Sequence, residues 1–378
     1  MNRNVLLLLL TAACLVAFAC AGDELPDTGP SVHEYVLFSP TDTFSYQYDS
    51  LEGTFALSDL DSVDITEVPL GHDFIIRAGE DMIVVKGTTD SNRVMLLSPT
   101  DTVLEIIRFF KDKVELLRDY SQFGTEPVKG IDSFYYEPST DSQLVALKEK
   151  YNLDSIAGDG DEIERIINLM VWAHGVVRHD GSSKNPEPRN ADNLITICRE
   201  EDRGVNCRMM ATILNEAYLA TGFKSRHITC LPYDKADQDC HVIDAVFAEG
   251  LHKWLYMDPT FEAYWMDKDS NLLSIEEVRI MMIDGETLLL SGNVNWNGEP
   301  YGEKNYREYV AKNLFRFSCP LVSEYGYESS PGDHVYVDLI PVDYDPDAAG
   351  TVDSTGETGD QLITYYTTNA GFFWQMPD

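Results

Sequence analysis

The chain has 378 residues and a formal net charge of −36, from 64 acidic and 28 basic residues. Nucleic-acid binding needs basic patches that neutralise phosphates, so this composition argues against nucleic acid as a partner. The seven cysteines are too few for a disulfide scaffold in a chain of this length, which suits one large or two ordinary domains.

The first twenty residues have the pattern of a secretory signal. A short basic start precedes an apolar run over residues 5–18, and Ala19-Cys20 follows. The small residue before Cys20 resembles a bacterial lipoprotein cleavage site, with Cys14 as a competing site. A transmembrane anchor is the alternative, but the run falls short of the roughly 20 residues that span a bilayer. We expect residues 1–20 to be a lipoprotein signal peptide and Cys20 to carry lipid.

The residues after Cys20 predict an acidic tether followed by a β-rich region. Similar acidic starts occur in surface-exported lipoproteins of Gram-negative bacteria, so we expect a lipid anchor in the outer membrane. Short alternating runs between residues 32 and 94 predict strands. The spacing over residues 103–120 predicts an amphipathic helix, capped by Thr100 or Asp101. We therefore predict a β-rich N-terminal region over residues 21–125 that ends in a helix.

Residues 126–378 form the second predicted domain. Helical patterns over residues 142–151 and 161–177 precede a polar, proline-containing stretch, 178–203, which we interpret as a loop across a cleft. Beyond residue 260 the patterns predict a helix over 301–315 and strands over 334–341 and 361–368.

Cys207 opens a helical pattern that ends near Gly222. A cysteine in the first helical turn lies near unpaired backbone N–H groups and the positive end of the helix dipole, which favour a thiolate. Most buried cysteines are inert, however, so Cys207 alone favours a core thiol over a nucleophile. Asn206 fits two roles equally well, a helix cap or a donor to an oxyanion.

His241 and Asp258 lie on two alternating runs joined by a short connection. A turn centred on Glu249-Gly250 would pair His241 directly with Asp258 across an antiparallel hairpin. Taken singly, His241 is as easily a satisfied core or surface histidine, and Asp258 is a common residue for a turn before Pro259.

Together these segments resemble the transglutaminase-like superfamily, a papain-like group. The matching parts are Gly204 to Cys207 at a helix start, the helix end at Gly222, His241 heading a strand, and the strand Trp254 to Thr260. The resemblance covers about residues 160–265. It implies an α+β fold in which a helix carrying Cys207 packs on an antiparallel sheet carrying His241 and Asp258.

By this resemblance Cys207 is the nucleophile, His241 the general base and acid, and Asp258 the residue that orients His241. The expected substrate is a peptide or protein amide, converted through a Cys207 thioester, with hydrolysis favoured over cross-linking. Trp254 and Tyr256 share the face of Asp258 and are candidates for the walls of the cleft, whereas Trp172 suits the core better. A binding or structural lipoprotein that keeps the fold without turnover is the alternative.

No cofactor or metal is expected. The acidic clusters at 159–164 and 343–347 do not match an ordered calcium loop, and no Cys-x-x-Cys spacing supports zinc. Cys230 and Cys240 flank a connection between two strand patterns, where a disulfide and two free thiols are equally compatible with the sequence.

Overall fold

The computed structural model describes residues 32–48, 51–88, 91–110, 113–119, 122–126, 130–131, 133–234, 237, 239–345 and 362–377. The expected signal peptide, Cys20 and the tether lie outside these residues. The chain divides into two compact units, residues 1–111 and 112–378, and each unit is described separately below. Within the described part of the chain, no helix has the length and apolar character needed to cross a membrane.

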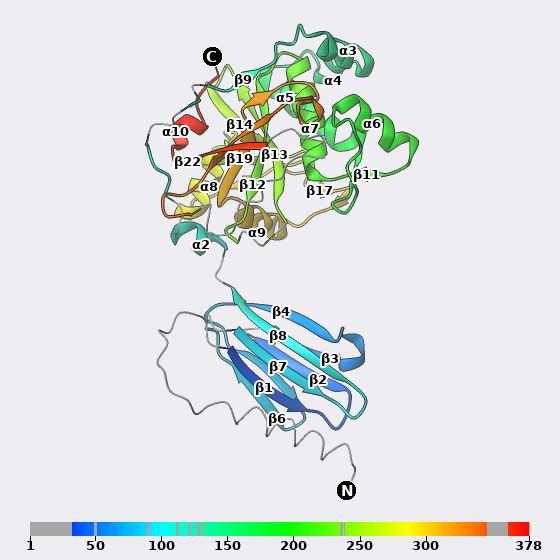
Figure 1. Ribbon diagram of the computed structural model, residues 1–378, viewed down its shortest axis with the longest axis vertical. Coiled ribbons are helices and arrows are strands. Elements are labelled where there is room, and N and C mark those ends of the chain that lie inside the picture. The colour runs from blue at the N-terminus through cyan, green and yellow to red at the C-terminus, as the bar shows by residue number, and fades with distance from the viewer. Residues whose placement is uncertain are drawn as a thin grey trace. The chain divides into compact units, whose positions relative to one another are not determined.

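The first unit contains two four-stranded sheets (Figure 1). One has the order β1-β7-β8-β4, with bounds Val32–Phe38, Ser91–Leu97, Thr102–Phe110 and Val63–Pro69. The other has the order β3-β2-β5-β6, with bounds Leu51–Ala56, Thr43–Tyr48, Phe74–Ala78 and Asp81–Val85, and a 3₁₀ turn, η1, at Leu57–Asp59. Buried side chains from both sheets, among them Phe44 and Val94, belong to one apolar core, so the sheets face each other.

The single helix predicted over residues 103–120 is wrong. Residues up to Phe110 form β8, which pairs with β4 on one side and β7 on the other. A short helix, α2 (Lys113–Asp119), follows in the second unit. Val103 and Ile107 are buried, and the intervening Leu104 and Ile106 are half-buried. Apolar residues occupy both odd and even positions, so the sequence pattern is compatible with a helix and with a strand. Pairing with β4 and β7 on its two edges stabilises the segment as a strand.

The second unit is built on a six-stranded sheet in the order β14-β13-β12-β19-β21-β22. Its strands are Lys253–Met257, His241–Ala248, Ser225–Leu231, Arg316–Pro320, His334–Leu339 and Leu362–Thr367 in that order. Neighbours run antiparallel except β21 and β22, which run parallel. The strands predicted over residues 334–341 and 361–368 are thereby confirmed.

Helices cover both faces of this sheet, and the predicted mixture of helices and strands is confirmed. The face that carries Val246 and Leu255 packs against α3 (Ser142–Tyr151), α4 (Leu153–Ala157), α5 (Glu162–Val176), α6 (Ala191–Glu200) and α7 (Cys207–Ala220). The opposite face, with Ile243 and Tyr256, packs against α2, α8 (Ile275–Asp284), α9 (Glu303–Asn313) and α10 (Ala370–Phe373). The helices predicted over residues 142–151, 161–177 and 301–315 correspond to α3, α5 and α9.

Several two-stranded pieces connect these elements. They are β9 (Tyr135–Tyr136) with β20 (Val322–Ser323), β10 (Arg178–His179) with β11 (Gly204–Val205), β15 (Trp265–Met266) with β16 (Leu289–Leu290), and β17 (Asn295–Trp296) with β18 (Glu299–Pro300). A 3₁₀ turn, η2, lies at Tyr327–Ser329. The stretch 178–203 is therefore not a plain loop as predicted, because it contains β10 and all of α6. Its helix is stabilised by the Asn190 cap and by burial of Leu194 and Ile195.

Candidate functional site

The start of α7 places Cys207 at the end of a close strand pairing. Asn206 is the N-cap of this helix, since its Oδ1 accepts the Met209 N–H at 3.2 Å. The preceding strand β11 runs parallel to β10. A Cβ atom on Gly204 would lie only 2.8 Å from the Arg178 carbonyl oxygen, so glycine is required for this approach. Of the two roles considered for Asn206, the cap is the one that its contact supports.

His241 and Asp258 meet, but through a different register from the one predicted. Ala248 pairs with Lys253 and Asp244 with Met257, so the hairpin closes through a four-residue turn, residues 249–252. This shifts the expected pairing by two residues and makes His241 and Asp258 diagonal neighbours. Because a shift of two residues keeps each side chain on its face of the sheet, the two groups still approach one another. His241 Nε2 and Asp258 Oδ2 are 2.7 Å apart.

The Asp258 carboxylate is fully buried and surrounded by hydrogen-bond donors. Its Oδ2 accepts from the Tyr306 hydroxyl at 2.8 Å as well as from His241. Its Oδ1 accepts the backbone N–H groups of Thr260 at 2.8 Å and Phe261 at 3.3 Å. Four donors around one carboxylate replace the water that burial removes, and they fix the direction in which Oδ2 faces the imidazole.

The Cys207 thiol has an environment that favours its ionised form. Burial acts to raise the pKa of Cys207, but hydrogen bonding with His179 and His241, the positive charge of His241 and the Val242 backbone N–H lower it to about 6. Burial acts to lower the pKa of His241, whereas the Asp258 carboxylate and the Cys207 sulfur raise it to about 10. Between these values the pair is a thiolate and an imidazolium, which is the form that a thiol nucleophile needs.

Aromatic rings enclose His241. The Phe261 ring packs edge-on against the imidazole with centroids 5.7 Å apart, and the Tyr309 ring lies at 5.2 Å. His241 is only 2% exposed as a result. Phe261 comes from the loop after β14, and Tyr306 and Tyr309 come from α9. No motif in the sequence predicts that these three residues lie at the site.

The structure corrects the expectation that Trp254 and Tyr256 line a cleft. Trp254 is 4% exposed and Tyr256 is 1% exposed, and both belong to the apolar core under the sheet. The Trp254 indole N–H donates to the Gln375 carbonyl, and the Tyr256 hydroxyl lies 2.8 Å from that of Tyr306. Tyr256 therefore reaches Asp258 only through Tyr306. Trp172 packs on the Tyr151 ring in the helical core.

The remaining cysteines of the described part of the chain are free thiols. Cys230 and Cys240 are not joined, and Cys198 and Cys319 are buried. Burial raises the pKa of Cys230 and of Cys240. Cys207 is thus the cysteine whose surroundings favour reactivity. Among the described residues, no group of three or more histidine, cysteine and acidic side chains is arranged to hold a metal ion.

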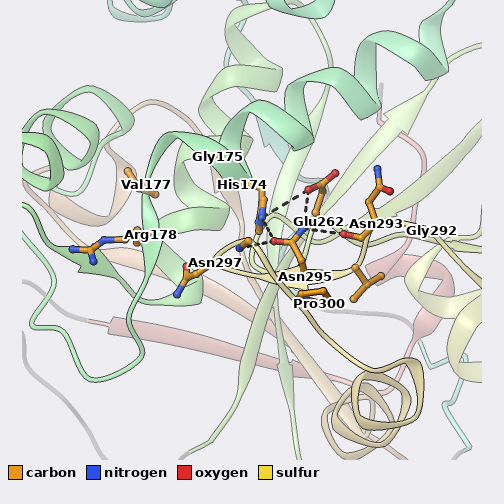
Figure 2. A pocket seen from close by; sticks show the side chains of 12 residues that line it. His174, Gly175, Val177, Arg178, Glu262, Gly292, Asn293, Asn295, Asn297 and Pro300 are labelled. Carbon is orange, nitrogen blue, oxygen red and sulfur yellow. Dashed lines mark hydrogen bonds and ion pairs between the residues drawn. The ribbon is translucent and has the colours of Figure 1, made fainter.

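A cavity of about 620 Å³ is lined in part by Glu262, which follows Asp258 closely along the chain (Figure 2). His174 also lines it, with Nδ1 2.9 Å from the Pro259 carbonyl and Nε2 2.8 Å from Asn295 Oδ1. Asn295 also donates to Glu262 at 2.9 Å. Since Pro259 follows Asp258 directly, this network ties the wall of the cavity to the segment that carries the carboxylate.

Comparisons with known proteins do not assign a function to this site. No protein-family model matches the chain, and no curated protein matches it. One similar solved structure is a candidate cysteine protease from Cytophaga hutchinsonii, with 16% identity and a TM-score of 0.26, covering 46% of this chain and 57% of that one. Another is red sea bream transglutaminase, with 12% identity and a TM-score of 0.21, covering 50% and 38%. The chain thus spans less than two thirds of either protein, and likeness at this level carries no argument about activity.

Proposed function

We propose that the protein is an exported lipoprotein whose second unit is a transglutaminase-like thiol enzyme acting on amide or peptide bonds. The observation that carries the proposal is the 2.7 Å contact between His241 and Asp258, beside a Cys207 thiol whose pKa is lowered by hydrogen bonding with His241. His241 uses Nε2 for the carboxylate, so Nδ1 is the nitrogen that exchanges a proton with the sulfur. A histidine that is buried only for packing is not expected to have an ionised thiol beside its second ring nitrogen.

The reaction follows from these groups. The Cys207 thiolate adds to the amide carbonyl carbon, and the carbonyl oxygen becomes an oxyanion near the N–H groups at the start of α7. The C–N bond then breaks as His241 gives its Nδ1 proton to the leaving amine, which leaves a thioester on Cys207. Asp258 stabilises the imidazolium and holds its tautomer throughout. Water, deprotonated by His241, cleaves the thioester to a carboxylic acid and restores the thiol.

Hydrolysis is the favoured second half of the reaction, because water needs no binding site of its own. A primary amine that attacks the same thioester would give a cross-link instead.

The cavity beside His174 is where we expect the groups that flank the scissile amide to bind, since it is open and its lining includes several polar side chains.

Labelling with a peptide-like thiol-trapping electrophile tests the proposal. We expect one label per chain, on Cys207, and loss of the label in Cys207→Ala and in His241→Ala. Incubation with a peptide pool, with and without a primary amine, then separates hydrolysis from transfer by the mass of the products. An unlabelled Cys207, or a label that does not depend on His241, would favour the non-catalytic binding or structural lipoprotein.

The lipid anchor is tested separately. We expect Cys20→Ser to release the protein from the membrane fraction, whereas Cys14→Ser leaves it anchored. Detergent partitioning of the two variants measures this directly, and the reverse result would place the processing site at Cys14.

A further inference from the structure

A second histidine, His179, shares the Cys207 sulfur with His241. Hydrogen bonding with both imidazoles lowers the pKa of the Cys207 thiol. His179 lies on β10, where it pairs with Val205, two residues before the cysteine. The close approach that Gly204 permits is what brings this histidine beside the start of α7. Nothing in the reaction proposed above uses His179.

The β17–β18 hairpin holds His179 at three points. Asn297 Oδ1 accepts the His179 backbone N–H at 2.7 Å, and Asn297 Nδ2 donates to its carbonyl oxygen at 3.0 Å. The Trp296 indole N–H donates to Nδ1 of the His179 ring at 2.9 Å. Two adjacent residues from a distant part of the chain therefore fix both the backbone and the ring of His179.

The Trp296 contact decides which nitrogen of His179 carries a proton. An indole N–H can only donate, so Nδ1 of His179 must accept with its lone pair. With Nδ1 occupied as an acceptor, the ring hydrogen is on Nε2, and Nε2–H is the ring donor left to meet the sulfur. His241 has the opposite arrangement, since its Nε2 meets a carboxylate and its Nδ1 is free to exchange a proton with Cys207.

We propose that His179 is a second catalytic histidine of the thiol site, a neutral hydrogen-bond donor to the Cys207 sulfur, and that Trp296 is the residue that fixes its tautomer. The proposal rests on the proposed thiol function. A neutral donor stabilises the thiolate without competing with His241 for the proton that the leaving amine needs. The two histidines thus divide the work, one holding negative charge on sulfur and the other transferring protons.

The tautomer of His179 can be observed by NMR of the full chain with ¹⁵N-labelled histidine, with the His179 signal assigned from its loss in His179→Gln. In the wild type we expect an unprotonated Nδ1 and a protonated Nε2, because Nδ1 accepts the Trp296 N–H. In Trp296→Phe we expect this preference to be lost, so that the Nδ1 signal moves toward that of a protonated nitrogen. Trp296 is 44% exposed, so this change leaves the fold intact. An Nδ1–H tautomer or an imidazolium in the wild type would overturn the proposal.

The effect on the sulfur is measured by alkylation of Cys207 with iodoacetamide, followed at the Cys207 peptide by mass spectrometry. At pH 6 we expect His179→Ala to slow alkylation about fivefold, since loss of one donor to a thiolate raises its pKa by about one unit and lowers the thiolate fraction from about one half to about one tenth. His179→Gln keeps an N–H donor and should recover much of that rate, and His72→Ala, in the first unit, should change nothing.

These readouts separate the two proposals because neither needs amide turnover. A wild-type Cys207 that reacts at pH 6 no faster than an ordinary thiol would sink the proposed function itself. A fast wild-type Cys207 with an unchanged rate in folded His179→Ala would overturn only the role of His179. If His179→Ala does not fold, the His179→Gln rate and the Trp296→Phe spectrum decide.

Discussion

Asp258→Asn should inactivate the site by reversing the tautomer of His241. The backbone N–H groups of Thr260 and Phe261 need an acceptor, so the single oxygen of the amide must stay at the Oδ1 position. The amide Nδ2 then faces His241 and the Tyr306 hydroxyl, where two acceptors are now required. His241 Nε2 must give up its hydrogen, and Nδ1–H then points at Cys207 and cannot accept its proton.

The size of this effect follows from the loss of both a charge and a tautomer. The same exchange in a serine-protease triad lowers kcat by about 10⁴-fold, and we expect a loss of about 10³- to 10⁴-fold here. Release of nitrophenol from p-nitrophenyl acetate measures acylation of Cys207. The matched control is Asp244→Asn, because Asp244 is also fully buried, lies on the neighbouring strand, and has a carboxyl whose pKa burial raises well above its usual range. A folded Asp258→Asn protein that acylates at the wild-type rate would refute the role of Asp258.

Three further predictions concern the surroundings of the site. Burial raises the pKa of Glu216 to about 8, against the N–H groups of Ala191 and Gly326. The protonated carboxyl therefore contributes to the free energy of unfolding. This contribution is complete below about pH 4.3 and falls by at most about 1.4 kcal/mol per pH unit as the pH rises to about 8. Glu216→Gln should flatten this dependence in urea unfolding, and parallel curves would contradict it. Gly204→Ala should destabilise the chain by about 1–3 kcal/mol and slow Cys207 alkylation, because its Cβ would collide with the Arg178 carbonyl oxygen. Gly175→Ala is the control and should have neither effect, since its Cβ would meet nothing within 4 Å. Calorimetry measures the stability of both variants, and alkylation measures the reactivity of Cys207. Asn293→Trp should fill part of the cavity and raise KM for peptides without changing Cys207 alkylation, and an unchanged KM would place substrate elsewhere.

The elements that carry the site were predictable because their signals are local. Cys207 follows a cap and a glycine and precedes an apolar helix, and its neighbours along the chain suffice to define that start. The hairpin was predictable in kind, but not in register, because Glu249-Gly250 is a weak turn signal and four residues rather than two form the turn. The predicted register was wrong by two residues, which leaves each side chain on the predicted face of the sheet. His241 and Asp258 approach each other because they share that face.

Residues that act through tertiary contacts left no local signal. Tyr306 and Tyr309 are spaced as a helix face, which predicts packing but not that one hydroxyl donates to Asp258. His179 stands in a polar stretch, and only the pairing of β10 with β11 brings it to Cys207. Trp254 and Tyr256 show the converse, since they share the strand face of Asp258 and yet lie in the core, because α8 and α10 cover that face.

The most direct test of the central claim is the mass of the protein quenched during reaction with p-nitrophenyl acetate at pH 7. We predict an added acetyl group mapped to Cys207, absent in Cys207→Ala and strongly reduced in His241→Ala, with a lifetime shortened by hydroxylamine, as a thioester requires. A chain that releases nitrophenol without carrying the acetyl group on Cys207, or that carries it equally without His241, would contradict a thiol mechanism at this site.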